Sequence, residues 1–258
     1  MDYEKEVAAA RRIAVRSAEM AIRHFERGIQ LEGKSDDSPV TDADKECEVF
    51  LSKALEEAFP DDGQMGEEGV AKPSRSGRTW IIDPIDGTRD FIRGNQQWGV
   101  LLGLEDNGKP VAGVAHFPIQ AKTYTAAVGG GSWCNDKRIR VSTISDVNRA
   151  VVCFNGLQNN RKWPYRDMVM DFLSQFWCVR SMSGSPDVVM VAAGQADIWV
   201  EPSAKAWDLC PMKVIVEEAG GVFFNFKGTD SIYEGNALVG NPHFEKLLRE
   251  TFVGLAQG

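Results

Sequence analysis

Two apolar segments flank the dipeptide Asn107-Gly108, and this arrangement constrains the fold more than any other local feature of the chain. The segments are WGVLLGLED (98–106) and KPVAGVAHF (109–117). Asn-Gly between apolar runs favours a two-residue hairpin turn, because both residues readily adopt the positive φ angles that such a turn requires. The pattern therefore predicts an antiparallel pair of strands, and with it a β-sheet.

Further strand-like segments and helical patterns alternate along the chain. Strands are expected in TWIID (79–83), KTYTAAV (122–128), RAVVCF (149–154), CVRSM (178–182), ADIWV (196–200) and GVFFNF (221–226). Helices are expected at 4–27, 45–58, 165–176, 186–193 and 209–219. Thr41 or Asp42 is expected to cap the second helix. The Gly-rich, polar stretch 63–78 is expected to form a loop.

The order of these elements predicts a mixed α/β fold. Residues 1–145 contain a helix pair followed by a meander, which indicates an α+β region, whereas residues 146–258 alternate strand and helix as an α/β region. The boundary is placed near Ser145. Because no repeat, low-complexity tract or long linker separates the two regions, they are expected to pack tightly as one unit.

The composition restricts the classes of function. With 43% hydrophobic and 26% charged residues, the chain is typical of soluble globular proteins. A net charge of −8 without a long basic run disfavours nucleic-acid binding. The N-terminal segment begins with acids and has no long apolar run, so no secretory signal or membrane span is expected and a cytoplasmic location is predicted. Five scattered cysteines without a CxxC pair argue against a disulfide framework or a structural zinc site.

Two carboxylates end the apolar strand in the string WIIDPIDGTRDF (80–91). Asp83 and Asp86 bracket a proline that fixes the turn, and Gly87 permits close approaches that a side chain would block. Hard cations prefer oxygen ligands, so carboxylates three residues apart on a rigid turn can converge on Mg²⁺. Asp, Pro and Gly are also ordinary turn residues, so the string by itself is compatible with a simple strand-ending turn.

Together with three further blocks, this string resembles the inositol monophosphatase family of metal-dependent phosphatases. The blocks are KSDDSPVTDAD (34–44), GEEG (66–69) and AWDLCPMKVIVEEAGG (206–221), and they occur in the family's order. Four matching blocks are far more specific than a single motif. The resemblance implies a layered αβαβα sandwich, a homodimer, two or three Mg²⁺ ions per site and inhibition by Li⁺.

Carried over position by position, the resemblance implies these metal ligands: Glu67, Asp83, the Ile85 carbonyl, Asp86 and Asp208. Asp44 would pair with Thr88 beside the attacking water, and Glu67 joins these two as a catalytic residue. Each acid also has an ordinary explanation as a loop acid, a helix cap or a first-turn acid, and only their joint occurrence favours metal binding. Water activated by the cations would attack phosphorus in line, without a phosphoenzyme.

The same resemblance implies substrate contacts at Gly87, Thr88, Gly184, Ser185 and Glu201. The amides of Gly87 and Thr88 would contact phosphate, and the other three residues would contact the alcohol. Glu201 is equally compatible with a strand-end acid before a proline. The continuation RDFIRGNQQW (89–98) departs from the TTNF type of inositol monophosphatases and is more similar to the histidinol-phosphate phosphatases of the family. Arg89 and Arg93 could contact substrate or lie on the surface.

These features predict Mg²⁺-dependent hydrolysis of a small phosphate monoester, either inositol monophosphate or histidinol phosphate. A nucleotide 3′-phosphatase or a sugar-bisphosphatase is the second enzymatic interpretation, less favoured because no long basic or aromatic insertion is visible. A catalytically silent, metal-binding regulatory protein is the alternative from another class. That alternative predicts a missing ligand, whereas all the expected ligands are present.

Overall fold

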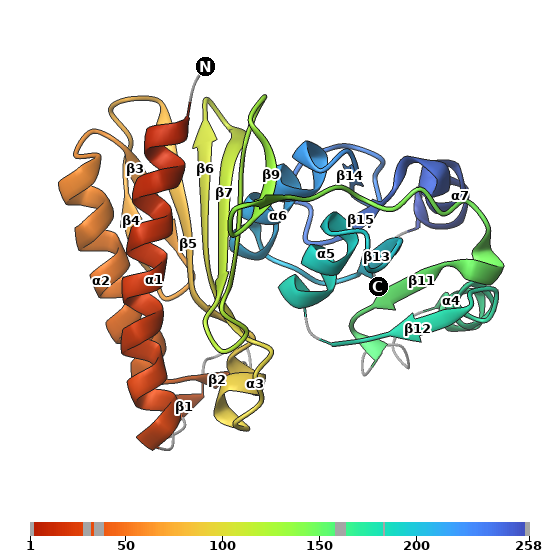
Figure 1. Cartoon of the computed structure of the whole chain (residues 1–258), viewed down its shortest axis with the longest axis horizontal. Helices are drawn as coiled ribbons and strands as arrows, with labels where there is room; N and C mark the ends of the chain where they lie inside the picture. The colour runs from red at the N-terminus through yellow and green to blue at the C-terminus, as the bar shows by residue number, and fades with distance from the viewer. Residues whose placement is uncertain (1–2, 28–31, 34–38, 158–163, 183, 256–258) are drawn as a thin grey trace.

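The computed structural model describes residues 3–27, 32–33, 39–157, 164–182 and 184–255, which form β-sheets interleaved with helices (Figure 1). The first block of the family resemblance, residues 34–44, lies partly outside this description, because 34–38 are not included. Among the helices in the described ranges, none is both long enough and apolar enough to cross a membrane.

Two long helices, α1 (Glu4–Arg27) and α2 (Asp42–Ala58), lie side by side near the N-terminus. The helix predicted at 4–27 is confirmed. Helix α2 starts three residues earlier than expected because Thr41 caps it: the Asp44 backbone N–H donates to the Thr41 hydroxyl at 3.3 Å, and the Asp44 carboxylate accepts the Thr41 N–H at 2.8 Å. This capping box decides between the two expected caps in favour of Thr41.

The larger sheet has eight strands and contains the predicted hairpin. Asn107 and Gly108 have φ angles of 51° and 74° between the paired residues Asp106 and Lys109, so the expected turn is confirmed. The strands are β3 (Gly63–Gly66), β4 (Ala71–Lys72), β5 (Arg78–Asp86), β6 (Gly99–Asp106), β7 (Lys109–Phe117), β8 (Lys122–Ala127), β9 (Gly131–Cys134) and β10 (Lys137–Arg138). Their order is β10-β9-β8-β7-β6-β5-β3-β4, with β3 parallel to β5. A separate antiparallel pair joins β1 (Glu32–Gly33) and β2 (Pro39–Val40).

The expectation of a continuous loop over 63–78 is wrong, because β3 lies within this stretch and pairs with β5. Composition hides the strand, since glycines are generally read as turn residues. A Cβ atom on Gly63 would lie 2.9 Å from the Lys72 carbonyl oxygen, so glycine serves here for the close approach of two backbones.

A smaller sheet of five strands follows in the sequence. Its strands are β11 (Val151–Phe154), β12 (Cys178–Arg180), β13 (Ile198–Glu201), β14 (Val222–Phe224) and β15 (Ala237–Gly240), in the order β12-β11-β13-β15-β14. Four of these strands were predicted, whereas β15 was not. The chain passes from the larger to the smaller sheet between Arg138 and Val151. The division into domains of residues 1–145 and 146–258 stays a prediction.

The remaining helices are α3 (Thr88–Ile92), α4 (Arg166–Leu173), α5 (Gly184–Ala192), α6 (Ala206–Glu218) and α7 (Glu245–Phe252), with short 3₁₀ turns at Val147–Arg149 and Pro242–Phe244. Helices α5 and α6 begin two and three residues before their predicted starts, and α3 was not predicted. Both early starts matter, because they place Gly184, Ser185 and Asp208 in first helical turns.

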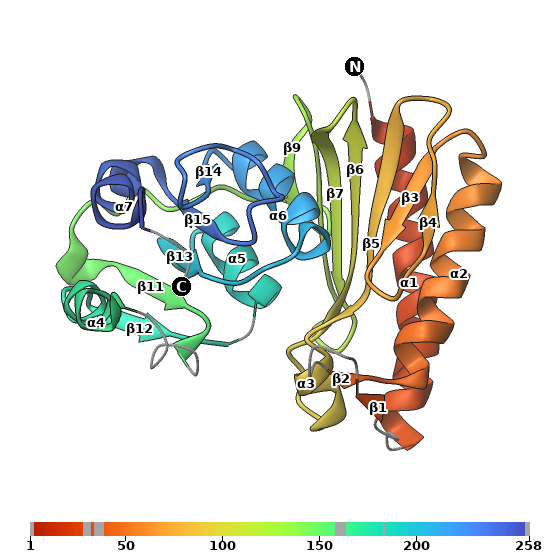
Figure 2. The ribbon, with the colours of Figure 1, turned by 180° about the vertical axis from the view of Figure 1, so that it is seen from behind.

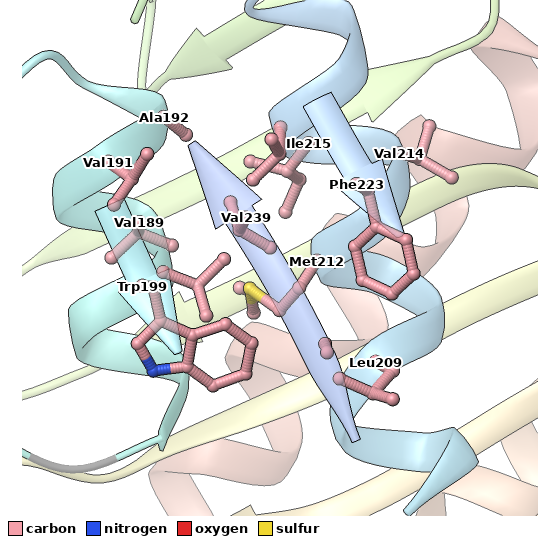
Figure 3. Close-up of a cluster of buried hydrophobic side chains, with 14 of the residues drawn as sticks. Val189, Val191, Ala192, Trp199, Leu209, Met212, Val214, Ile215, Phe223 and Val239 are labelled. Atoms are coloured by element: carbon pink, nitrogen blue, oxygen red, sulfur yellow. The ribbon is translucent and has the colours of Figure 1, made fainter. Parts of the chain in front are cut away.

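These elements stack in five layers (Figures 1 and 2). Helices α1 and α2 cover one face of the larger sheet, α5 and α6 lie between the sheets, and α4 and α7 cover the outer face of the smaller sheet. The apolar core between the sheets includes Trp199, Met212 and Val239 (Figure 3). The predicted αβαβα sandwich is confirmed.

Glycines allow α6 to lie directly on the larger sheet. A Cβ atom on Gly103 of β6 would lie 2.4 Å from the Cys210 Sγ, and one on Gly113 of β7 would lie 2.4 Å from the Pro211 carbonyl oxygen. Real Cβ atoms do not approach backbone this closely, because protein interiors are already close-packed. The two glycines therefore fix how deeply the N-terminal half of α6 sits against the sheet.

The substitution Gly113→Ala is expected to lower the free energy of unfolding by about 1–3 kcal/mol, because the α6 backbone must move to admit the methyl group. Urea unfolding followed by circular dichroism measures this. Gly130→Ala, at an exposed turn position where the added Cβ would lie 3.2 Å from the Ala127 carbonyl oxygen, is the control and should lower the free energy less than Gly113→Ala does. An unchanged urea midpoint for Gly113→Ala would contradict the close packing.

Candidate active site

The end of strand β5 carries two of the predicted ligands, Asp83 and Asp86. Pairing with β6 is regular up to Asp83 and shifts register before Asp86, so the chain bulges between them. The Ile85 N–H donates to Asp83 Oδ1 at 3.0 Å and fixes this bulge. Gly87 follows with a φ of 86°, and a Cβ atom there would lie 2.6 Å from the Gln97 carbonyl oxygen. Only glycine fits this position, as the sequence indicated.

Asp208 joins these carboxylates from a distant part of the chain. It lies in the first turn of α6, where its carboxylate accepts the Lys205 N–H at 2.7 Å. Ligand oxygens of Asp83, Asp86 and Asp208 all lie within 4.8 Å of one another. Glu67, the residue after β3, lies beside Asp83, and its charge raises the pKa of that carboxyl group. The fold thus gathers the four predicted acidic ligands.

Burial and mutual repulsion make this cluster unfavourable without a counter-ion. Asp83 is 1% exposed, and its pKa is raised well above the ordinary value by burial and then by the charges of Glu67, Asp86 and Asp208. Burial and Asp86 likewise raise the pKa of Asp208. Burial raises the pKa of Asp86, against the lowering effect of hydrogen bonds from Ser185. Hard oxygen donors gathered in this way fit a divalent cation, whose charge would offset the repulsion.

Asp44 and Thr88 meet beside this cluster, as the sequence predicted. The Thr88 hydroxyl lies 3.1 Å from the Ile85 carbonyl oxygen and 3.4 Å from Asp44 Oδ1, and it can donate to either. Asp44 is fully buried, and burial raises its pKa to about 6, although the hydroxyl and N–H of Thr41 oppose this by donating to Oδ2 at 2.5 and 2.8 Å. A hydroxyl held between a carboxylate and a carbonyl is well oriented for proton transfer.

The predicted substrate-side residues approach Asp86 from the other half of the chain. Gly184 and Ser185 begin α5, and the Ser185 hydroxyl donates to the Asp86 carboxylate. Glu201 ends β13 and is 7% exposed. Burial raises its pKa to about 7, while the Ser203 N–H, 3.0 Å from its Oε1, acts in the opposite direction. These three residues border the acidic cluster.

Two further buried polar residues lie beside Glu201 and were missed from the sequence. Asn155 follows β11 and lowers the pKa of Glu201, and the parallel pairing of β11 with β13 explains why their ends meet. Asp187, in the first turn of α5, is fully buried and also raises the pKa of Glu201. A polar residue at a strand end was the available signal for Asn155, whereas nothing distinguished Asp187. Arg89 and Arg93 are exposed.

Similarity to known proteins extends over the whole chain. A model of the inositol monophosphatase family matches residues 2–257. The chain belongs to the inositol monophosphatase family. It is 36% identical over 228 residues to a histidinol-phosphatase from Chlorobaculum parvum, covering 88% of each chain. It is 33% identical over 229 residues to an inositol-1-monophosphatase from Rhizobium meliloti, covering 86% of this chain and 85% of the relative.

A solved structure supports the same family assignment. The extragenic suppressor protein SuhB from Bartonella henselae superimposes with a TM-score of 0.90 and 27% identity, covering 97% of this chain and 99% of that chain. As a member of this metal-dependent phosphatase family, the protein is a phosphoric monoester hydrolase. Asp83, Asp86 and Asp208 are, among the residues described, the acidic group able to hold the metal.

Removal of divalent cations with EDTA is expected to make the stability pH-dependent. The pKa values of Asp83, Asp86 and Asp208 are raised in the folded protein, so the folded state binds protons more tightly than the unfolded state. Stability without metal should therefore fall as the pH rises from the ordinary carboxyl value of about 4 through the raised values.

Saturating Mg²⁺ is accordingly expected to raise the Tm more at about pH 8 than at about pH 5. Differential scanning fluorimetry measures both shifts. The Asp83→Asn variant, which lacks one buried carboxylate, should show a weaker pH dependence in EDTA. Equal Mg²⁺-induced shifts at the two pH values would contradict this electrostatic description.

Proposed function

We propose that the protein hydrolyses the phosphate monoester of a small metabolite in a Mg²⁺-dependent reaction. The observation that carries this proposal is the cluster of buried Asp83 with half-buried Asp86 and Asp208, whose ligand oxygens lie within 4.8 Å of one another. A donor set made of carboxylates suits a hard cation such as Mg²⁺, whereas zinc sites generally contain histidine or cysteine. The phosphatase family of the chain supports the same reaction.

The proposed ligands are Glu67, Asp83, the carbonyl oxygen of Ile85, Asp86 and Asp208. Membership in the family supports the inclusion of the Ile85 carbonyl oxygen, which lies 3.1 Å from the Thr88 hydroxyl. Two or three bound Mg²⁺ ions would neutralise the phosphate and lower the pKa of a coordinated water.

Asp44 and Thr88 are proposed to handle the proton of the attacking water, with Glu67 as the third catalytic residue. The Thr88 hydroxyl can accept a hydrogen bond from water while it donates to Asp44. With a pKa of about 6, Asp44 is ionised at neutral pH and can take up the proton. The amides of Gly87 and Thr88 are proposed to hold the phosphate while the bond from phosphorus to the alcohol oxygen breaks.

Gly184, Ser185 and Glu201 are proposed to bind the leaving alcohol, and histidinol phosphate is the substrate that we favour. Glu201 is buried beside a second buried carboxylate, Asp187, and a cationic amine would relieve their repulsion through a charge-assisted hydrogen bond. A polyol could also donate hydroxyl groups to Glu201, which keeps inositol monophosphate as the second candidate. Relatives named for both activities support this pair.

Family membership also supports a homodimer, inhibition by Li⁺ and a cytoplasmic location as parts of the proposal. Phosphate release should fall with added LiCl but not with matched NaCl. Analytical ultracentrifugation should show a mass near twice that of the 28.5 kDa chain. A monomer would contradict the proposed homodimer. Equal effects of LiCl and NaCl would contradict the proposed inhibition by Li⁺.

The substrate proposal is tested by phosphate release, with and without Mg²⁺, from histidinol phosphate, inositol 1-phosphate, fructose 1,6-bisphosphate and 3′-phosphoadenosine 5′-phosphate. Histidinol phosphate is expected to have the highest kcat/KM. Glu201→Gln should raise the KM for histidinol phosphate about tenfold or more, because the charged hydrogen bond between the carboxylate and the amine is lost. Preference for either of the last two substrates would favour the bisphosphatase or nucleotide interpretation, and no turnover of any would favour the silent regulatory one.

Asp86→Asn is expected to reduce kcat by about a thousandfold or more, because a metal contributes several kcal/mol of charge stabilisation. Asp90→Asn is the matched control: Asp90 lies four residues further on, in α3, accepts a hydrogen bond from Asn95 at 2.5 Å and is outside the metal-binding group, although its charge raises the pKa of Asp86. The Asp90→Asn variant should keep a kcat within a few-fold of that of the unsubstituted protein. Comparable losses in both variants would show that the charge of this segment matters in general and would contradict the assigned ligand.

A further inference from the structure

A buried glutamate on α2 faces the segment that carries Glu67. Glu48 is 2% exposed, and its two carboxylate oxygens accept separate backbone N–H groups: Oε2 accepts that of Glu68 at 2.7 Å, and Oε1 accepts that of Val70 at 2.8 Å. Hydrogen bonds from N–H groups to an ionised carboxylate are stronger than neutral ones. Glu48 therefore holds two points of one short backbone segment.

Glu67 lies directly beside these points of attachment. Its own N–H donates to the Ile82 carbonyl oxygen of β5 at 3.1 Å, and the Gly66 N–H donates to the Val70 carbonyl oxygen at 2.8 Å, which closes the turn. The backbone of Glu67 is thus held by β5 on one side and, through the next residue, by Glu48 on the other. This attachment limits the directions in which the Glu67 side chain can point.

The sequence of the turn is adapted to the carboxylate of Glu48. A Cβ atom on Gly66 would lie 2.5 Å from both the Cδ and the Oε2 of Glu48, so any larger residue would displace the carboxylate. Gly66 is needed for this contact and not for a special φ angle, because it is not among the glycines with positive φ. The first glycine of GEEG therefore leaves the space through which the Glu48 carboxylate reaches the backbone N–H groups.

Helix α2 serves both sides of the proposed site. Asp44 and Glu48 are four residues apart and lie on the same face of the helix. Asp44 approaches Thr88, whereas Glu48 holds the turn that carries Glu67. One helical turn of α2 thus separates the residue that contacts Thr88 from the residue that holds the turn with Glu67.

We propose that Glu48 is a positioning residue that acts through Glu67 and sets the affinity of the site for its divalent cation. It does not itself bind the metal. The inference rests on the proposed function, in which Glu67 is a ligand. Groups that orient metal ligands generally change metal affinity or activity by about 10- to 100-fold when they are substituted.

Mn²⁺ binding to the metal-free protein, followed by electron paramagnetic resonance without substrate, tests this inference. Glu48→Gln keeps the shape but sets an NH₂ group against a backbone N–H, so the Kd for Mn²⁺ should rise about tenfold or more. The Mg²⁺ concentration for half-maximal activity should rise in parallel. Glu105→Gln is the control, because Glu105 is a buried glutamate of β6 that bonds the Tyr233 hydroxyl at 2.7 Å. It should leave the Kd unchanged.

A double-mutant cycle separates positioning from a general structural effect. If Glu48 acts through Glu67, the double variant Glu48→Gln/Glu67→Gln should bind Mn²⁺ no more weakly than Glu67→Gln alone. A purely structural role would lower the Tm in EDTA without changing the Kd of the folded protein, and this result would overturn the inference. If Glu67→Gln also leaves the Kd unchanged, the proposed ligand set itself is wrong.

Discussion

The gathering of carboxylates at the end of β5 is the constraint on which the rest of the structure depends. Burial raises the pKa values of Asp83, Asp86 and Asp208, and the charge of Asp86 raises those of Asp83 and Asp208 further. Like charges in this setting oppose folding. Apolar packing on both faces of the larger sheet and on both faces of the smaller one counteracts this cost. The fold therefore holds these carboxylates in an arrangement that their mutual repulsion disfavours. A bound cation would offset this repulsion.

Backbone pairing, more than side-chain attraction, brings these acids together. Parallel pairing aligns Gly66 of β3 with Ile82 of β5, so Glu67 follows beside Asp83. The close contact of α6 with Gly103 and Gly113 sets the position of the helix whose first turn carries the last acid. Repelling groups can be held in this way because the hydrogen bonds and apolar contacts of the strands and helices outnumber the unfavourable interactions.

Local features were predictable from the sequence, whereas long-range contacts were not. The turn at Asn107-Gly108 depends on the residues that form it, and the family's motif order indicated which acids meet. The turn expected after Asp83 is instead a bulge, because β5 continues through Asp86. Strand β3 was missed because its glycines reflect the approach of a neighbouring backbone. Asp187 was missed for a similar reason: inside a helical pattern, nothing shows that it will be buried beside Glu201. Sheet order likewise depends on pairings far apart in sequence.

The two sheets divide the proposed tasks. Glu67, Asp83 and Asp86 belong to the larger sheet and its turns, whereas Glu201 and Asn155 end strands of the smaller one. Strand ends and loops tolerate substitution better than the sheet interior. The proposed alcohol-binding residues around Glu201 are therefore free to vary while β3 and β5 keep the acids in register. Under the proposed assignment, this separation gives a physical reason why relatives of similar identity carry the names of phosphatases with different substrates.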